Sequence, residues 1–240
     1  MNQLLKGMPS SFKQIFPVNK PIIGMIHLAG SGRPEKLRRA LEELRIYEEE
    51  GVDGATIEDY HGDFRDVRSA LYDSQDFKIA RGVNILHGGA SSMDYAALLG
   101  GKFVQFDNLN ATGLTPQEYT RAKGQMDIPV FGEVRFKYTR DTGNSLEQDI
   151  CEARSLCEAI VTTGSGTGIE APLTKLRDFR KIMADFPLIV GSGVTAANAR
   201  SQLEYADGAI VGSYFKNGDT ESLLDVKRVK ELMNVVRRLR

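Results

Sequence analysis

The chain has 240 residues, enough for one sizeable hydrophobic core. Its 31 lysines and arginines balance 32 acidic residues, so it lacks the basic excess expected of a nucleic-acid-binding protein. No apolar run approaches the ~20 residues of a membrane-spanning helix, and the N-terminus lacks the apolar stretch of a secretory signal. We therefore expect a cytoplasmic protein with no nucleic-acid partner and no transmembrane segment.

Residues 1–19 are predicted to be a short helix and linker whose apolar side chains, including Phe12 and Phe16, cap one end of the domain. From residue 20 onward, short apolar runs alternate with helical segments. Eight runs are predicted as strands: Lys20–His27, Val52–Asp59, Gly82–His87, Lys102–Leu109, Pro129–Lys137, Ala159–Thr163, Leu188–Gly191 and Ala209–Ser213.

A helical segment is predicted after each strand. The clearest begins at Pro34 and stops at Gly51, and capping boxes at Thr115–Glu118 and Ser145–Gln148 open two more. The second of these is expected to carry both cysteines, Cys151 and Cys157, as free thiols, because that spacing on one helix does not allow them to bond. Further helices are predicted over 63–73, 91–99, 172–185, 196–204 and 222–239.

The strict alternation of strand and helix predicts a parallel sheet with helices outside it. Eight such units in about 220 residues are typical of an α/β fold with a single (β/α)₈ TIM barrel. We therefore expect a short N-terminal helical extension over 1–19 and one barrel domain over 20–240.

The predicted strands carry polar residues on one face. In 129–137, Val130 and Val134 share the face that must pack on the helices, whereas Glu133, Arg135 and Lys137 share the other. Three charges on a buried face would be costly unless they surround a wet cavity at the carboxyl end of the barrel. The same alternation on other strands predicts a polar ring of His27, Glu58, Asn84, Asp107, Glu133, Arg135 and Lys137.

The ring predicts acid–base chemistry. Glu133, Asp107 or Glu58 is the candidate general base or acid, and Lys137 the candidate that stabilises developing negative charge. His27 and Asn84 complete the catalytic candidates. A purely structural polar network is the alternative, and Mg²⁺ held by Glu58, Asp59, Asp107 and Glu133 is a weaker one. No resident metal or cofactor is otherwise expected.

The sequence GSGV before the last-but-one helix is suited to an anion. Gly191 and Gly193 let the backbone approach a ligand closely, and free N–H groups at a helix start point towards it. The neighbouring loop adds further donors, and Lys216 a positive charge. Glycines that only make tight connections are the alternative. The predicted phosphate-binding residues are Gly164, Gly191, Ser192, Gly193, Gly212, Ser213 and Lys216.

Several segments, in order along nearly the whole chain, are similar to the BtpA/SgcQ family. They include KPIIGMIHL, EEGVDGATIED, EAIVTTGSGTG, PLIVGSGVTAAN and ADGAIVGSYFK. The resemblance implies a (β/α)₈ barrel related to phosphate-binding barrels. It does not imply one reaction, because some members are linked to photosystem I biogenesis in cyanobacteria and others lie among sugar-metabolism genes. The loops after the first three strands depart from the family pattern, which leaves room for a divergent or inactive barrel.

Two functional hypotheses follow. The first is an enzyme acting on a small phosphorylated metabolite, either a sugar phosphate or a nucleotide or nucleoside phosphate, with isomerase, lyase and glycosyl-bond cleavage all open. The second is a non-catalytic assembly or regulatory factor built on the same barrel. A homo-oligomer is compatible with either hypothesis.

Overall fold

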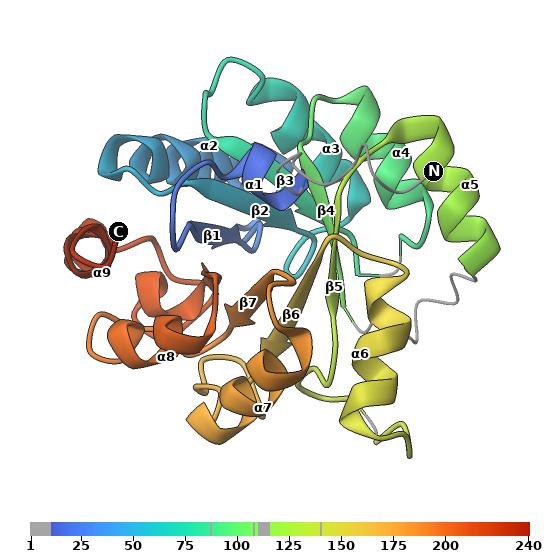
Figure 1. Cartoon of the computed structure of the whole chain (residues 1–240). Helices are drawn as coiled ribbons and strands as arrows, with labels where there is room; N and C mark the ends of the chain where they lie inside the picture. The colour runs from blue at the N-terminus through green and yellow to red at the C-terminus, as the bar shows by residue number, and fades with distance from the viewer. Residues whose placement is uncertain (1–10, 87, 108, 110–115, 140) are drawn as a thin grey trace.

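The computed structural model describes residues 11–240 except 87, 108, 110–115 and 140, and eight parallel strands in it close into a barrel (Figure 1). The strands neighbour one another in chain order, and the last pairs with the first. The predicted (β/α)₈ barrel is therefore confirmed. The strands are β1 (Ile22–Ile26), β2 (Gly54–Glu58), β3 (Ala80–Asn84), β4 (Phe103–Phe106), β5 (Val130–Glu133), β6 (Ala159–Thr163), β7 (Leu188–Gly191) and β8 (Gly208–Val211).

The helices surround the strands, and α2 packs against α9 so that the first and last parts of the ring meet (Figure 1). None of the helices in the described residues is both long and apolar enough to cross a bilayer. They are α1 (Ser11–Ile15), α2 (Arg33–Glu50), α3 (Phe64–Asp73), α4 (Ser91–Leu98), α5 (Pro116–Met126), α6 (Leu146–Arg154), α7 (Leu173–Met183), α8 (Ala199–Tyr205) and α9 (Val226–Arg237), with a 3₁₀ turn η2 (Ser213–Lys216).

Local sequence explains several helix ends. Gly51 ends α2 with a left-handed φ of 76°, and its N–H caps the helix. The capping box that opens α6 at Ser145 is confirmed, since Ser145 and Gln148 exchange hydrogen bonds. Thr115, which belongs to the other predicted box, lies outside the described residues.

The predicted strand bounds match the structure only at β6 and β7, and the differences at β3 and β5 matter most for the site. β3 begins at Ala80, before the predicted Gly82, and ends at Asn84. β5 ends at Glu133 although the alternation continues to Lys137, because the backbone turns at Arg135, whose φ is +50°. The Arg135 side chain then leaves the barrel interior and pairs with Asp149 of α6 at 2.9 Å, so Arg135 does not belong to the inner polar ring.

Some helix predictions also need correction. α6 ends at Arg154, so it carries only Cys151, and Cys157 lies buried beyond it with its thiol donating to the Ala153 carbonyl. Both thiols are free, as expected. α8 begins at Ala199 rather than at 196, because the Thr195 and Asn198 side chains each bond the other's backbone N–H and hold a preceding turn.

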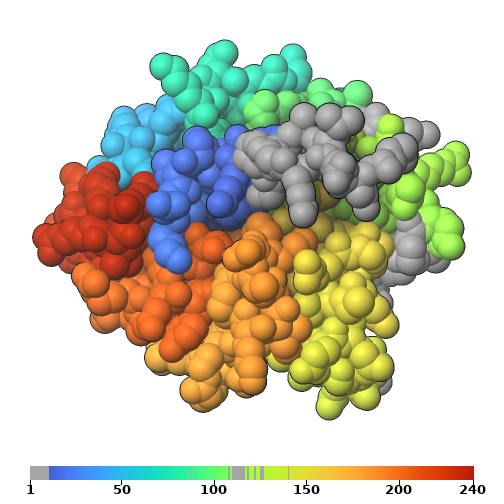
Figure 2. All heavy atoms as spheres, viewed as in Figure 1, coloured from blue at the N-terminus to red at the C-terminus, as the bar shows by residue number. Residues whose placement is uncertain are grey.

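The amino-terminal end of the barrel is filled by aromatic rings. Phe12 and Phe16, from α1 and the residues after it, lie against Phe103 of β4 and Phe131 of β5. The last two rings stack with centroids 4.5 Å apart. A Cβ at Gly82 would lie 2.1 Å from the Phe103 ring, so only glycine fits there. Figures 1 and 2 show the blue segment that contains α1 lying over the middle of this face.

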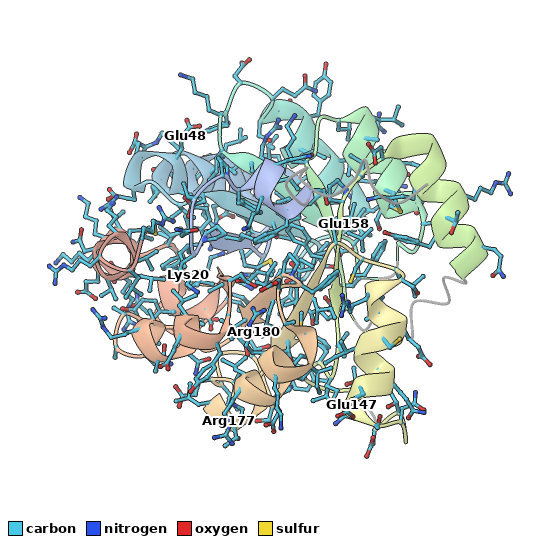
Figure 3. All side chains as sticks on the ribbon, in the orientation of Figure 1. Lys20, Glu48, Glu147, Glu158, Arg177 and Arg180 are labelled. Atoms are coloured by element: carbon cyan, nitrogen blue, oxygen red, sulfur yellow. The ribbon has the colours of Figure 1, made fainter. Side chains whose placement is uncertain are left out.

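Three carboxylates at the same end perform one repeated structural task. Asp53, Glu158 and Asp207 lie just before β2, β6 and β8, and each accepts the first N–H of the preceding strand. The acceptor distances to Ile22, Val130 and Leu188 are 2.8, 2.6 and 2.8 Å. Cations pair with these carboxylates, as Arg180 does with Asp207; Glu158 and Arg180 are labelled in Figure 3. These three carboxylates therefore have structural roles.

Candidate active site

The carboxyl ends of the strands open into a pocket that encloses about 520 Å³ of free space, including its opening to solvent. Its polar side is built from inward-facing residues of β1, β2, β4 and β5 and of the segments that follow these strands. Its opposite side is built from the glycine-rich loops after β6, β7 and β8. Among the predicted site residues, those that line it are His27, Glu58, Asp107, Glu133, Lys137, Gly191, Ser192, Gly212 and Ser213.

Two side-chain amides organise the carboxyl groups. The register of β2 and β3 sets Glu58 beside Asn84, and Asn84 Nδ2 donates to Glu58 Oε1 at 2.9 Å and to Asp107 Oδ1 at 2.8 Å. Gln105 Nε2 donates to Glu133 Oε1 at 2.8 Å. Asn84 thus holds two carboxyl groups close together without contributing to the pocket wall.

Burial changes the protonation of these carboxyl groups. The pKa of Glu58 is raised to about 8, by burial first and by the charge of Asp107 second, although Lys137 acts in the opposite direction. The pKa of Glu133 lies well above its usual value, again through burial first and Asp107 second. The cluster of Glu58, Asp107 and Glu133 therefore holds at least one proton near neutral pH and can offer both an acid and a base.

The cluster also contains polar atoms whose hydrogen-bonding capacity is unused. Among the described residues, Glu133 Oε2, Gln105 Oε1 and Asn84 Oδ1 are buried without a hydrogen-bond partner. Buried polar atoms are normally paired, so such a concentration beside a pocket is typical of a site that a ligand or water completes.

Lys137 supplies the positive charge next to the cluster, from the loop after β5. Its backbone N–H donates to Thr163 Oγ1 at 2.8 Å. Lys175 of α7 fixes the same loop by donating from Nζ to the carbonyl oxygens of Arg135 and Thr163, both at 2.7 Å. Burial lowers the pKa of Lys175 to about 8.

His27 directly follows β1 and is only 5% exposed. Its Nε2 lies 4.0 Å from Glu58 Oε2, and its Nδ1 lies 3.4 Å from Lys216 Nζ. Burial lowers the pKa of His27 well below its usual value, and Lys216 lowers it further. The ring is therefore neutral under ordinary conditions.

The glycine-rich side is assembled by close contacts between loops. Ser192 Oγ accepts from the Gly164 N–H at 3.0 Å and donates to the Ile169 carbonyl at 2.8 Å. A Cβ at Gly193 would lie 2.2 Å from the backbone nitrogen of Glu170, so the loops after β6 and β7 pack directly together. The Ser192 hydroxyl is thus used for contacts within the wall.

Four predicted site residues lie outside the pocket lining. Asn84 acts through the carboxyl groups that it binds, and Gly164 and Gly193 shape the loops. Lys216 is fully buried and pairs with Glu43 of α2 at 2.9 Å. Its ammonium group lies behind His27, so a direct contact with a bound phosphate is not available to it in this arrangement.

The predicted site lacks some residues that the structure places at the pocket. The alternation already directs Gln105 of β4 inward, two positions before Asp107, although the predicted ring does not include it. Tyr60 lines the pocket with its ring edge-on to His27, at a centroid distance of 5.6 Å. No sequence signal marks Tyr60, or Lys175 and Glu43, whose roles depend on contacts between distant segments.

The described residues do not support the magnesium alternative. No three of their His, Cys, Asp or Glu side chains are arranged to hold a metal ion. Asp59, one of the proposed ligands, instead accepts the Leu86 N–H at 3.0 Å. His87 lies outside the residues that the structure describes.

The sequence matches a model of the BtpA family over residues 18–238. An uncharacterized protein of Archaeoglobus fulgidus is 28% identical, over 92% of this chain and 100% of its own length. The protein named Photosystem I biogenesis protein BtpA of Synechocystis is 24% identical, over 93% of this chain and 90% of its own length.

Solved structures resemble the barrel at low sequence identity. Phosphoribosyl anthranilate isomerase from Thermus thermophilus has a TM-score of 0.64 and 14% identity, covering 92% of this chain and 100% of its own. Thiamine phosphate pyrophosphorylase from Pyrococcus furiosus has a TM-score of 0.63 and 15% identity, covering 92% and 96%. At this identity the likeness shows the fold alone.

Proposed function

This chain belongs to the BtpA family, and from that premise we propose that it is an enzyme acting on a small phosphorylated metabolite at the carboxyl end of its barrel. One observation carries the proposal. Two buried carboxyl groups with raised pKa values, Glu58 and Glu133, face a pocket whose other wall consists of glycine-rich loops. Burying carboxyl groups with unused hydrogen-bonding capacity costs free energy, and such groups cluster at functional sites.

The carboxyl cluster suits proton transfer. A protonated member donates to a leaving or carbonyl oxygen, and an ionised member removes a proton, because their mutual repulsion keeps them from ionising together. Lys137 stabilises negative charge that develops on the substrate. Isomerisation, bond cleavage by a lyase and glycosyl-bond cleavage all use such a pair.

The glycine-rich wall suits the phosphate group. Gly191, Gly212 and Gly168 keep side chains away from this part of the pocket, and the Ser213 hydroxyl lies on its surface. Two of the similar folds bear names that contain phosphorylated substrates, thiamine phosphate and phosphoribosyl anthranilate. The family resemblance and the open glycine wall together favour a sugar phosphate or a nucleotide or nucleoside phosphate.

A thermal-shift titration with inorganic phosphate, sugar phosphates and mononucleotides tests the proposal. A ligand at 100 times its Kd stabilises the protein by about 2.7 kcal/mol, which raises Tm by roughly 5–10 °C for a chain of this size. Ser213→Asp adds a negative charge to the wall and should abolish the shift. Ser213→Asn has the same size without the charge, so it should retain more of the shift.

Turnover then separates the two hypotheses. Glu133→Gln should abolish conversion of the stabilising ligand while the fold is kept, and Glu147→Gln, an exposed carboxyl at the start of α6 (Figure 3), should leave it unchanged. Ligand binding with no turnover by the parent favours the second candidate, a non-catalytic assembly factor. The name of the Synechocystis relative is the observation behind that candidate. We also propose a cytoplasmic location and a homo-oligomer, which are compatible with both candidate functions.

A further inference from the structure

A chain of buried polar contacts connects α2 to the pocket through His27. Glu43 Oε2 lies 2.9 Å from Lys216 Nζ, and Lys216 Nζ lies 3.4 Å from His27 Nδ1. The Lys216 side chain is fully buried. Burying an ion pair costs free energy, so its placement directly behind a pocket residue needs a reason.

The chemistry of the ammonium group determines the state of the histidine ring. A lysine ammonium has three hydrogen-bond donors and no acceptor. His27 Nδ1 can therefore interact favourably with Lys216 only as an acceptor, which means that Nδ1 carries no proton. Glu43 holds the Lys216 ammonium group in place through their 2.9 Å contact. The ring proton must then be on Nε2.

The ring orientation directs Nε2 to the pocket. A Cβ at Gly212 would lie 2.7 Å from His27 Cε1, so glycine is needed for the ring to fit. Tyr60 meets the ring on its edge, and Nε2 lies on the side of Glu58, 4.0 Å from its Oε2. Tyr60 and Glu58 both line the pocket.

The other charged groups around His27 also disfavour a second ring proton. Lys216 from η2, His61 from the loop after β2 and Lys137 from the loop after β5 all lower its pKa, in addition to burial. Glu58 of β2 is the carboxyl near Nε2, and its pKa of about 8 leaves it mainly protonated at neutral pH. The strongest partner that could stabilise an imidazolium is therefore largely uncharged.

We infer that Lys216 and Glu43 are positioning residues that hold His27 as the neutral Nε2–H tautomer, which presents a hydrogen-bond donor to a carbonyl oxygen of the substrate. The inference rests on the proposed function and narrows its substrate class to phosphorylated compounds that contain a carbonyl group. A neutral imidazole is a weak acid, so it polarises an oxygen without giving up its proton.

The corresponding reaction is proton transfer next to the carbonyl. An ionised carboxylate of the cluster takes the proton from the carbon beside the carbonyl, and the C–H electron pair forms the C=C bond of an enolate. The negative charge moves to the oxygen, where His27 Nε2–H and the Lys137 ammonium group stabilise it. In a compound with a hydroxyl group on the deprotonated carbon, the hydroxyl proton passes to the former carbonyl oxygen, and return of the carbon-bound proton to the former carbonyl carbon forms the new C=O. This completes an isomerisation with no co-reactant consumed.

NMR of the full chain with ¹⁵N-labelled histidine tests the tautomer directly. We expect His27 Nδ1 to resonate as an unprotonated ring nitrogen and Nε2 as a protonated one from pH 5.5 to 8, with His27→Gln identifying its signals. Lys216→Met should release the ring, giving mixed tautomers or a titrating ring, and Glu43→Gln should do so more weakly. A cationic His27 at pH 6, or the Nδ1–H tautomer, would overturn the inference, and the parent protein alone decides this if a variant fails to fold.

A paired titration tests the substrate chemistry. Ribulose 5-phosphate and dihydroxyacetone phosphate carry a carbonyl group, whereas ribitol 5-phosphate and glycerol 3-phosphate do not. The carbonyl compounds should shift the Nε2–H proton resonance of His27, and the alcohols should not. Equal shifts with both series would contradict the carbonyl assignment. Binding of neither series would contradict the proposed function while the tautomer result stands on its own.

Discussion

Phe131 and Glu133 lie two positions apart on the same inward face of β5, yet they belong to opposite environments. Phe131 stacks on Phe103 in the aromatic plug at the amino end of the barrel. Glu133 is also buried, but one of its carboxyl oxygens has no hydrogen-bond partner among the described residues. One end of the barrel is thus closed by apolar packing, whereas the other holds polar groups at an energetic cost.

The acidic residues at the two ends show the same contrast. At the amino end, Glu158 accepts the Val130 N–H at 2.6 Å and lies 2.7 Å from Lys123 Nζ. At the carboxyl end, Glu58 receives one amide hydrogen bond, from Asn84, and a raised pKa. Carboxyl groups that stabilise the fold pair with cations and strand N–H groups, while those of the proposed site are left partly unsatisfied. The following predictions test this division.

The largest expected effect is the pH dependence that Glu58 contributes. Its pKa rises from 4.5 to about 8 on folding, a shift equivalent to about 5 kcal/mol. Because the folded state holds the proton more tightly, this stability is fully present below pH 4.5 and is lost as pH rises through 8. Glu58→Gln cannot ionise, so we expect the parent to lose up to about 5 kcal/mol relative to the variant between pH 4 and pH 8.5.

Urea unfolding of both proteins across that pH range measures the difference. Glu147→Gln provides the control, since its carboxyl is exposed and its substitution should leave the pH profile parallel to that of the parent. A constant difference between Glu58→Gln and the parent at all pH values would show that Glu58 is an ordinary ionised carboxylate.

A substitution in the aromatic plug should lower the free energy of unfolding by an amount that does not depend on pH. Phe131→Ala removes a fully buried ring that contacts three other aromatic rings, and we expect it to cost about 3–5 kcal/mol in urea unfolding at any pH from 5 to 8. Phe64, which is 44% exposed, is the matched control, and Phe64→Ala should cost about 0.5 kcal/mol. A loss below 1 kcal/mol for Phe131→Ala would mean that the plug contributes little to stability.

Sequence alone predicted much of this division. Alternation along β2 placed Ile57 among the helices and Glu58 inside, and the structure has both there, because period-two alternation is a local property of a strand. The end of β5 could not be predicted in this way. Val134-Arg135-Phe136-Lys137 continues the alternation, but the backbone turns where Lys175 of α7 binds the Arg135 carbonyl.

Lys216 shows the same limit at the site. It follows a glycine-rich turn, where a lysine is usually read as a phosphate ligand, and its local sequence gives no other indication. Its burial depends on Glu43, which α2 brings from a distant part of the chain to supply a counter-ion. Contacts between distant segments determine the function of such residues, and a single sequence does not contain them in any periodic pattern.

The next prediction concerns an effect of intermediate size. Replacing a carboxylate should change the free energy of unfolding in opposite directions at the two ends of the barrel. Glu158→Gln weakens the charge-assisted bonds to the Val130 N–H and Lys123, and we expect it to cost about 1.5–3 kcal/mol. At pH 8.5, Glu58→Gln should show the opposite sign and stabilise the protein. Chemical denaturation of the two variants beside the parent at that pH tests both statements, and a shared sign would refute the division.

The smallest expected effect is the coupling between the two ends. Phe16→Leu alters the plug and Glu58→Gln alters the pocket, and the two side chains have no partner in common among the described contacts. Their effects on the free energy of unfolding should therefore add to within about 0.5 kcal/mol. A second cycle, Asn84→Ala with Glu58→Gln, breaks a 2.9 Å hydrogen bond inside the pocket and should give a coupling of about 0.5–3 kcal/mol. If the first cycle coupled as strongly as the second, the plug would influence the carboxyl groups through the strands, and the two ends would have to be treated as one cooperative core.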